Sequence, residues 1–223
     1  DWQSPSKNMK LSVIIPVLNE TDIINQTIDS LRPLADAVAL EIIVSDGDPE
    51  GGTLNAITNT NVKKVTSPPG RGRQLNAGAA AATGDVYLFL HADTRLPENA
   101  GQLMIDTCTD LAVAAGAFYL GIDSSRKVFR AVERAASWRS RVTRIPYGDQ
   151  AVFIKAAVFK EIGGFRPIPI MEDIDFARRL KRGGHHLRFI PCRVRTSARR
   201  WESEGVLYAT LRNYSLAILF CLG

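Results

Sequence analysis

The chain of 223 residues is 45% hydrophobic and 23% charged, which fits one well-filled globular core and excludes disordered, collagen-like and coiled-coil proteins. Its formal net charge of +5 combines an acidic first half, with −6 over residues 1–111, and a basic second half, with +11 over residues 112–223. This asymmetry indicates either one surface for a cation and another for anions, or an unevenly charged solvated surface.

In the first half of the chain, short apolar strands alternate with helical segments. We expect strands at residues 11–16, 41–45, 62–66 and 86–90, and helices from residue 19 and at residues 53–60 and 73–82. This alternation with short connections predicts an α/β fold with a mostly parallel central sheet. Ligands of such sheets bind at the carboxyl ends of the strands, where Asn19, Glu20, Asp46 and Asp93 all fall.

The alternation weakens after about residue 112. We expect strands at residues 113–120, 151–154 and 187–190, and helices at residues 126–144, 172–182 and from about 202. No Ser/Gly-rich linker separates the halves, so the sequence indicates one domain over residues 10–200, followed by an apolar or amphipathic C-terminal helix over residues 201–223. Arg212 and Asn213 interrupt the apolar stretch of this helix, which disfavours a membrane-spanning segment.

Two features bear on the cellular compartment. Cys108, Cys192 and Cys221 lie far apart and form no CxxC pair, so neither a disulfide framework nor a structural zinc site is expected. A reducing cytoplasm fits best. Residues 1–8 are polar and hold no signal peptide, so we expect them to form an extension that frays.

Asp46 and the pair Arg71 and Arg73 are candidates for ligand binding. Asp46 follows a buried strand, where it either forms a turn with its Gly and Pro neighbours or accepts hydrogen bonds from a base or ribose. The two arginines stand at the amino end of a helix, where the helix dipole favours anions over cations. They indicate either a flexible basic loop or a site for an anion such as a diphosphate; the spacing excludes a P-loop.

Two acidic groups are candidates for chemistry. Asp93 ends the segment 91–93 after the strongest strand, where it can bind a divalent cation or cap a turn. Glu172, Asp173 and Asp175 open a helix, where they can cap it or supply a general base toward a hydroxyl.

A basic cluster lies near the C-terminal helix, at Arg193, Arg195, Arg199 and Arg200 beside Trp201. Such a cluster suits phosphate or lipid headgroups, and it lacks the aromatic spacing of a nucleic-acid platform, so no nucleic-acid partner is expected. The apolar helix beside it can lie in a membrane interface. Packing on the core, or on a second subunit in a homodimer, explains its apolar residues equally well.

The order of these motifs resembles the family 2 glycosyltransferases of the GT-A fold over roughly residues 10–200. The resemblance is carried by LSVIIPVLNE (11–20), EIIVSDG (41–47), GGT (51–53), NAG (76–78), GDVYLFLHAD (84–93), GGF (163–165) and ED (172–173). The segments GRGRQLNAG, LFLHADT, YGDQ and TSARRWE look like a compact bacterial subgroup, labelled radical-SAM/selenium-domain-associated or arsenosugar-biosynthesis glycosyltransferases.

The resemblance implies a Rossmann-like three-layer sandwich and a UDP- or GDP-linked sugar donor. Residues that it places around the donor are Pro16, Asn19, Glu20, Asp46, Arg71, Arg73, Asn76, His91 and Asp93. Residues that it places toward the acceptor are Asp149, Gln150, Gly164, Phe165 and Glu172. Asp93 matches the metal-binding acid of the family's DxD motif, here reduced to His91-Ala92-Asp93, so Mn or Mg is the implied cofactor. Asp173 matches the catalytic base.

The implied activity is transfer of a sugar to an acceptor hydroxyl, inverting and assisted by a metal. One alternative is a sugar-nucleotide binding module with a degenerate site, which the reduced DxD motif permits. Another is a nucleotidyltransferase of related fold, which the arginine-rich loop without lysine at residues 70–73 disfavours.

Overall fold

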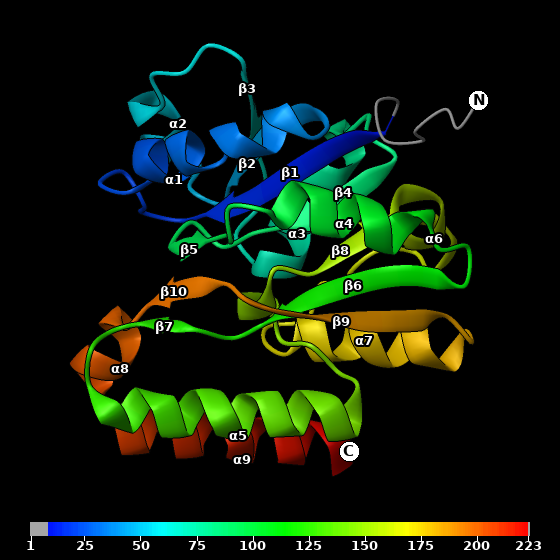
Figure 1. The fold of residues 1–223 in the computed structure, drawn as a ribbon. Coiled ribbons are helices and arrows are strands. Elements are labelled where there is room, and N and C mark those ends of the chain that lie inside the picture. Colours follow the sequence, from blue (N-terminus) through cyan, green and yellow to red (C-terminus); the bar gives the residue numbers. More distant parts are fainter. Residues whose placement is uncertain (1–8, 223) are drawn as a thin grey trace.

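A seven-stranded sheet runs through the middle of the molecule in the order β3-β2-β1-β4-β8-β6-β9 (Figure 1). This computed structural model describes residues 9–222, so the predicted extension at residues 1–8 lies outside the described residues. The strands of the sheet are β1 (Lys10–Val17), β2 (Ala39–Asp46), β3 (Val62–Thr66), β4 (Val86–Phe89), β6 (Val113–Tyr119), β8 (Phe153–Lys155) and β9 (His186–Arg193). β8 pairs antiparallel with both its neighbours and the other pairs are parallel, which confirms the predicted mostly parallel sheet.

β1 is buried on both faces because successive side chains of a strand point to opposite sides. Val13 and Ile15 pack in one cluster with the helices α1 (Ile24–Ser30) and α4 (Ala100–Thr109). Ile14, between them, packs in the other cluster with three helices. These are α3 (Arg71–Ala81), α6 (Ala156–Glu161) and α7 (Glu172–Arg182). Helices therefore cover both faces of the sheet, and the predicted three-layer sandwich is confirmed (Figure 1).

A second, small sheet adjoins the carboxyl edge of the large one. It consists of β5 (Thr94–Arg95), β10 (Arg195–Ser197) and β7 (Ile122–Asp123), in that order. Beyond it a third apolar cluster joins α5 (Lys127–Thr143), α8 (Arg199–Glu204) and α9 (Val206–Leu222). α5 and α9 run side by side at one end of the molecule (Figure 1). Three short helical segments complete the chain, at Arg32–Asp36, Gly52–Ala56 (α2) and Gly148–Gln150.

The structure differs from the sequence-based elements in several places. Helix α6 and the short strands β5, β7 and β10 were not predicted, α1 begins only at Ile24, and α2 ends already at Ala56. Helix α4 was not predicted; its threonines and glycine are weak helix formers, and it is stabilised by packing Met104 and Ile105 into the core. Helix α3 begins two residues earlier than expected, at Arg71. The C-terminal helix is two helices, because Gly205 adopts a φ of +89° between α8 and α9.

No helix within residues 9–222 combines the length and the apolar character needed to cross a membrane.

The pairing of β6 with β8 depends on the absence of a side chain at Gly116. This residue lies opposite Phe153, and a Cβ built on it would come within 2.1 Å of the Phe153 ring. Phe153 is fully buried against Phe118, so its ring has no space to move. We expect Gly116→Ala to lower the free energy of unfolding by about 1–3 kcal/mol, the usual cost of overpacking.

Urea denaturation of Gly116→Ala, Phe153→Leu and the double variant measures this effect. The cost of Gly116→Ala should shrink when residue 153 is Leu, because the ring is then gone. An equal cost in both backgrounds would contradict the argument.

Candidate active site

Polar side chains gather where the parallel strands β1, β2 and β4 end. The register pairs Val17 with Asp46, so these two strands end at the same level of the sheet. Beyond Val17 the chain turns at Asn19, which takes the left-handed conformation with a φ of +58° that Asn tolerates. Pro16 lies past the last residue of β1 that pairs with β4, where its missing N–H leaves no gap in that ladder.

Asp46 is fully buried at the end of β2. Its Oδ1 accepts a hydrogen bond of 2.9 Å from the backbone N–H of Asp48, which is the predicted turn. Its Oδ2 has no hydrogen-bond partner within residues 9–222. Burying a carboxylate oxygen without a hydrogen-bond partner costs free energy. A ligand that donates a hydrogen bond to this oxygen removes that cost.

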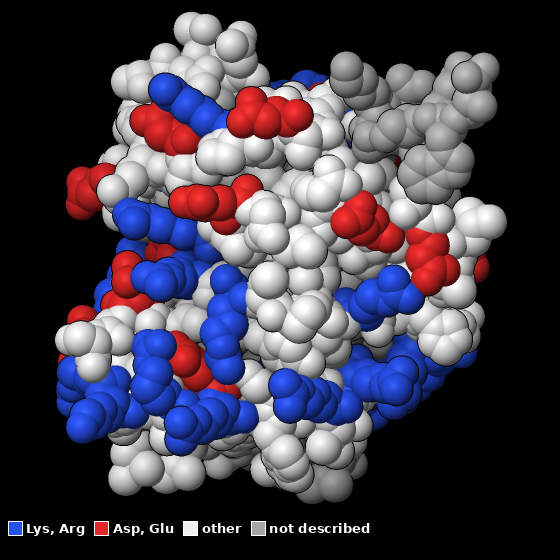
Figure 2. All heavy atoms as spheres, viewed as in Figure 1, with Lys and Arg blue, Asp and Glu red and all other residues white. Residues whose placement is uncertain are grey.

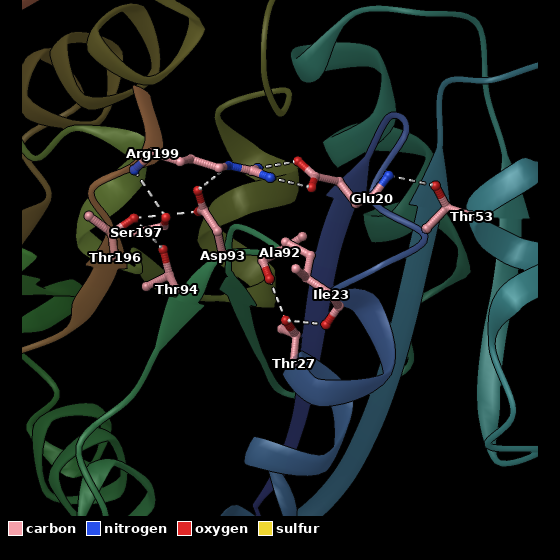
Figure 3. A network of polar contacts seen from close by, with 10 residues as sticks. All are labelled: Glu20, Ile23, Thr27, Thr53, Ala92, Asp93, Thr94, Thr196, Ser197 and Arg199. Atoms are coloured by element: carbon pink, nitrogen blue, oxygen red, sulfur yellow. Dashed lines mark hydrogen bonds and ion pairs between the residues drawn. The ribbon is translucent and has the colours of Figure 1, made fainter. Parts of the chain in front are cut away.

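Arg199, at the start of α8, joins the ends of β1 and β4 (Figure 3). Its guanidinium donates two hydrogen bonds to the carboxylate of Glu20, one of them 2.8 Å long from Nη1 to Oε2. Its Nε lies 3.3 Å from Oδ2 of Asp93. The guanidinium fork therefore holds two carboxylates that come from distant parts of the chain. We call this the Glu20–Arg199–Asp93 bridge.

The small sheet fixes the position of this bridge. The Oγ1 of Thr196 lies 3.4 Å from Oδ1 of Asp93, and the backbone N–H of Ser197 donates a hydrogen bond of 3.1 Å to the carbonyl oxygen of Asp93. Ser197 Oγ in turn accepts from the backbone N–H of Arg199 at 3.1 Å. On the β1 side, the backbone N–H of Glu20 donates to Thr53 Oγ1 at 3.1 Å (Figure 3).

The donor set around Asp93 fits a divalent cation only in part. Within the described part of the chain, no three His, Cys, Asp or Glu side chains are arranged so that they could hold a metal ion by themselves. Mg²⁺ is commonly held by one or two carboxylates together with substrate phosphates and water. Asp93 therefore suits a cation that is shared with a diphosphate, and it does not suit a cage built from protein ligands alone.

A narrow pocket beside the bridge brings together five of the predicted residues. Its lining includes Arg71, His91, Phe165, Glu172 and Asp173. Arg71 comes from α3, His91 from the end of β4, and the two acids from the start of α7. The pocket therefore combines cationic, acidic and apolar side chains from both halves of the sequence.

Gly148 lets His91 and Asp173 approach each other. A Cβ on Gly148 would lie 2.9 Å from Nε2 of His91 and 3.3 Å from Oδ2 of Asp173, so only glycine fits between them. The Gly148 N–H donates to Oδ2 of Asp173 at 2.5 Å, and the Ile174 N–H donates to Oδ1 at 2.7 Å. Asp173 is therefore held as a partly exposed carboxylate in the first turn of α7, a position that the helix dipole favours for an anion.

Two other titratable groups of the pocket, Glu172 and His91, have shifted pKa values. Burial raises the pKa of Glu172, the charge of Asp173 raises it further, and Arg71, whose Nη1 lies 3.7 Å from the Glu172 carboxylate, offsets part of the shift. Burial lowers the pKa of His91 well below its usual value, and the cations Arg71 and Arg200 add to this effect. His91 is therefore a neutral imidazole at pH 7.

Asp149 follows Gly148 and lies within the field of the same groups. Burial raises the pKa of its carboxyl to about 6; Arg139 offsets part of this shift and Asp173 adds to it. Asp149 thus lies close enough to Asp173 to feel its charge.

Several predicted residues occupy structural positions. The side-chain amide of Asn76 exchanges two hydrogen bonds, of 2.8 and 2.9 Å, with the backbone of Phe165. Gly164 is buried, with a φ of +65°, and its carbonyl oxygen accepts a hydrogen bond from Arg179 at 2.6 Å. Arg73 is exposed on α3. Asn76 and Gly164 therefore shape the pocket wall, and a direct donor contact of Arg73 stays a prediction.

Gln150 does not face the pocket, contrary to the prediction. Its side chain is fully buried; Oε1 accepts from Arg139, Ser140 and the Tyr147 N–H, and Nε2 donates to the Phe118 carbonyl. The turn around Gly148 closes over an amide whose hydrogen-bonding atoms are all used, so Gln150 positions Gly148 and Asp149.

Sequence reasoning did not assign Arg199 and Arg200 to the site. The run TSARRWE is predicted as a motif of the bacterial subgroup, and its arginines as part of a basic cluster for phosphate or lipid headgroups. Nothing in its spacing shows that it reaches strands more than 100 residues earlier. The acidic first half and the basic second half of the sequence meet at this bridge, and this charge asymmetry was the available signal.

Comparisons with known proteins agree with this architecture. The sequence model described as "Glycosyl transferase family 2" matches residues 12–168. The chain is 25% identical over 230 residues to the probable glycosyltransferase YdaM of Bacillus subtilis (strain 168), covering 91% of this chain and 53% of that protein. It is 34% identical over 92 residues to glucosyl-3-phosphoglycerate synthase of Mycobacterium tuberculosis (strain CDC 1551 / Oshkosh), covering 37% of this chain and 28% of that protein. The chain thus spans about half the length of these relatives or less.

Two solved structures illustrate the likeness in fold. Mannosyltransferase PcManGT from Pyrobaculum calidifontis, solved with GDP-Man and Mn²⁺, has a TM-score of 0.65 at 23% identity, covering 83% of this chain and 56% of that chain. S. aureus TarS 1–349 has a TM-score of 0.66 at 16% identity, covering 95% of this chain and 66% of that chain. The fold, with polar groups at the carboxyl edge of its sheet, is that of the GT-A proteins. The family match over more than half of the sequence adds that the chain belongs to glycosyltransferase family 2.

The raised pKa of Asp149 makes stability depend on pH. The folded chain holds this proton more tightly than the unfolded chain between the ordinary pKa of 3.8 and about 6, so stability falls as pH rises through that window. Asp149→Asn removes this ionisation, so we expect the variant to have a higher melting temperature than the wild type above pH 6. The gain in the free energy of unfolding should be at most about 3 kcal/mol, from 1.36 kcal/mol per pKa unit. Near pH 4 the difference should vanish. Thermal melts at both pH values, with the exposed Asp123→Asn as control, test this; a gain that does not change with pH would contradict it.

The bridge also predicts a change in metal affinity. In Arg199→Ala the carboxylates of Glu20 and Asp93 lose their shared cation and repel each other, and a divalent ion relieves that repulsion. In the absence of nucleotide, we expect this variant to bind Mn²⁺ about tenfold more tightly than the wild type. This factor follows from the interaction energy of charges near a protein surface.

Calorimetric titration with Mn²⁺ measures this, with Arg195→Ala as the control arginine variant from β10. Equal affinity in the wild type and Arg199→Ala would show that the two carboxylates cannot share an ion.

Proposed function

We propose that the protein is a glycosyltransferase that moves a sugar from a nucleoside-diphosphate sugar to an acceptor hydroxyl, with inversion at the anomeric carbon. The observation that carries this proposal is the position of Asp173. Its carboxylate is oriented by two backbone N–H groups and lines a pocket with Arg71 and His91. A base fixed beside the cationic Arg71 is the arrangement that transfer to a hydroxyl requires.

The nucleoside would lie over the ends of β1 and β2. The unpaired Oδ2 of Asp46 would accept a hydrogen bond from the base or the ribose, next to Pro16 and Asn19. The diphosphate would lie between Arg71 and Asp93, within the field of Arg200. Glu20 would reach the donor once the bridge with Arg199 opens.

The reaction would proceed by direct displacement. The acceptor oxygen attacks the anomeric carbon while its proton passes to Asp173, and the bond from that carbon to the diphosphate oxygen breaks on the opposite face. The departing nucleoside diphosphate takes the electron pair, and Arg71 and Arg73 stabilise the charge that it gains. Glu172 and Asp149 flank the base, and their raised pKa values reduce the negative charge around it at acidic pH.

A divalent cation, Mn or Mg, would be held by Asp93 together with the diphosphate oxygens. When bound, such an ion neutralises charge on the leaving group. PcManGT was solved with GDP-Man and Mn²⁺, and glucosyl-3-phosphoglycerate synthase from Mycobacterium tuberculosis with UDP-Glc and Mn²⁺. Both support this choice and a UDP- or GDP-linked donor for the present chain. A hexose as the transferred sugar is part of the proposal.

A second candidate is a nucleotide-sugar binding module without turnover. The pairing of Asp93 with Arg199 favours it, because the only carboxylate of the reduced DxD motif already has a partner. Calorimetry with UDP and GDP, with and without Mn²⁺, followed by a screen of nucleotide-sugar donors for hydrolysis, separates the two. Slow donor hydrolysis supports the transferase, and binding without hydrolysis or transfer supports the module.

Asp93 and Asp173 should respond differently to nearly isosteric substitution. Asp93→Asn should weaken metal-dependent nucleotide binding and turnover together. Asp173→Asn should leave nucleotide binding nearly unchanged, and its transfer rate should fall by roughly 10²–10⁴-fold, the usual contribution of a general base.

Nucleotide affinity by calorimetry, measured beside single-turnover transfer for each variant, provides the comparison. Transfer by Asp173→Asn at the wild-type rate would show that Asp173 only caps α7 and that the mechanism is wrong.

A further inference from the structure

Helices α5 and α9 present an apolar surface at the end of the molecule farthest from β3. Eleven large apolar side chains are exposed among the described residues, and eight of them lie on these two helices. They are Val128, Trp138 and Val142 on α5, and Leu207, Tyr208, Leu211, Ile218 and Leu219 on α9. We call this surface the α5–α9 face. Such a concentration on one surface is unusual, since scattered exposure is the norm.

Helix α9 is two-sided. Ala209 and Ala217 are buried against the protein, and Leu207, Leu211 and Ile218 follow at helical spacing on the opposite side. Leu207 is 74% exposed. The one charged side chain of this helix within residues 206–221, Arg212, pairs with Glu204 at 2.6 Å. The Arg212 guanidinium lies 5.6 Å from the centre of the Tyr208 ring, so this ion pair borders the outer side of α9, which carries no other charge within residues 206–221.

Helix α5 continues this surface and borders it with cations. Val128, Trp138 and Val142 share one side of the helix, together with the exposed alanines 131 and 135. The exposed cations of α5 form the adjacent row, which consists of Lys127, Arg130, Arg134 and Arg141. Figure 2 shows this row of Lys and Arg over α5 and an uncharged surface beneath it, over α9.

We propose that the α5–α9 face docks on an anionic lipid surface, with its apolar side chains among the acyl chains and the α5 cations at the headgroups. An amphipathic surface with a basic border is the arrangement that interfacial helices use. A second copy of the chain fits less well, because in a two-fold contact it presents the same apolar and cationic face, whose described residues offer no acidic groups to the α5 cations. This inference is independent of the proposed function.

Flotation with vesicles tests the proposal. The wild-type chain should float with phosphatidylcholine vesicles that contain phosphatidylglycerol, and should stay in the bottom fraction with pure phosphatidylcholine. Leu211→Glu/Ile218→Glu should bind at least tenfold more weakly. In Arg134→Glu/Arg141→Glu, the affinity for anionic vesicles should fall about fivefold for each arginine removed. Added salt should weaken the binding of the wild type, because it screens the attraction between the α5 cations and the lipid headgroups.

Leu111→Glu is the matched control, since Leu111 is 94% exposed outside the α5–α9 face. It should float like the wild type. Trp138 gives a second readout that needs no variant with altered charge: its emission should shift to the blue and be quenched by brominated lipids, and Trp138→Phe should lose this signal.

Three results would overturn the proposal. The first is a wild-type chain that does not float with anionic vesicles and shows no Trp138 shift. The second is flotation of Leu211→Glu/Ile218→Glu at the wild-type level. The third is a wild-type dimer in light scattering that this double variant converts to a monomer, because the face would then bind a second copy.

Discussion

The burial of β1 on both faces orders the rest of the structure. Its side chains enter two apolar clusters, one beneath α1 and α4 and one beneath α3, α6 and α7, so β1 can only be a central strand. Parallel partners on each side then place the ends of β2 and β4 beside its own end. Asp46, Glu20 and Asp93 meet there because the backbone leaves the sheet at these points, and their polar side chains cannot enter either cluster.

The cost of gathering acids at one edge is offset by arginines from both halves of the chain. Arg199 holds Glu20 and Asp93, and Arg71 lies beside Glu172. Each of these pairs is partly exposed, so each can exchange partners when a charged ligand arrives, whereas a fully buried pair would resist exchange. Acidic and basic side chains from distant parts of the sequence therefore meet in one site. Their charges balance there, and each side chain can still pair with a charged ligand.

The segment after β9 connects this edge to the α5–α9 face. β10 lies in the small sheet beside Asp93, α8 begins with Arg199, and α9 follows after Gly205. Trp201 packs against Phe129 of α5 with ring centroids 6.1 Å apart, which anchors α8 to the third apolar cluster. A single stretch of chain therefore carries both the arginine of the bridge and the outer apolar helix.

The α/β class, the parallel strands, and the positions of Asp46, Asp93 and Asp173 at element ends could be predicted from the residues alone, since apolar periodicity and the places where it stops are local properties. Which polar groups meet could not be predicted and depends on the folded arrangement. Gln150 is buried, Asn76 holds the Phe165 backbone, and Arg199 reaches Glu20 across 179 positions of the chain. These contacts depend on packing between distant segments, and neither spacing nor composition encodes a distance in space. Helix α4 belongs to the same class, because packing outweighs the local preference of its residues. The division at Gly205, in contrast, follows the local preference of glycine for a positive φ.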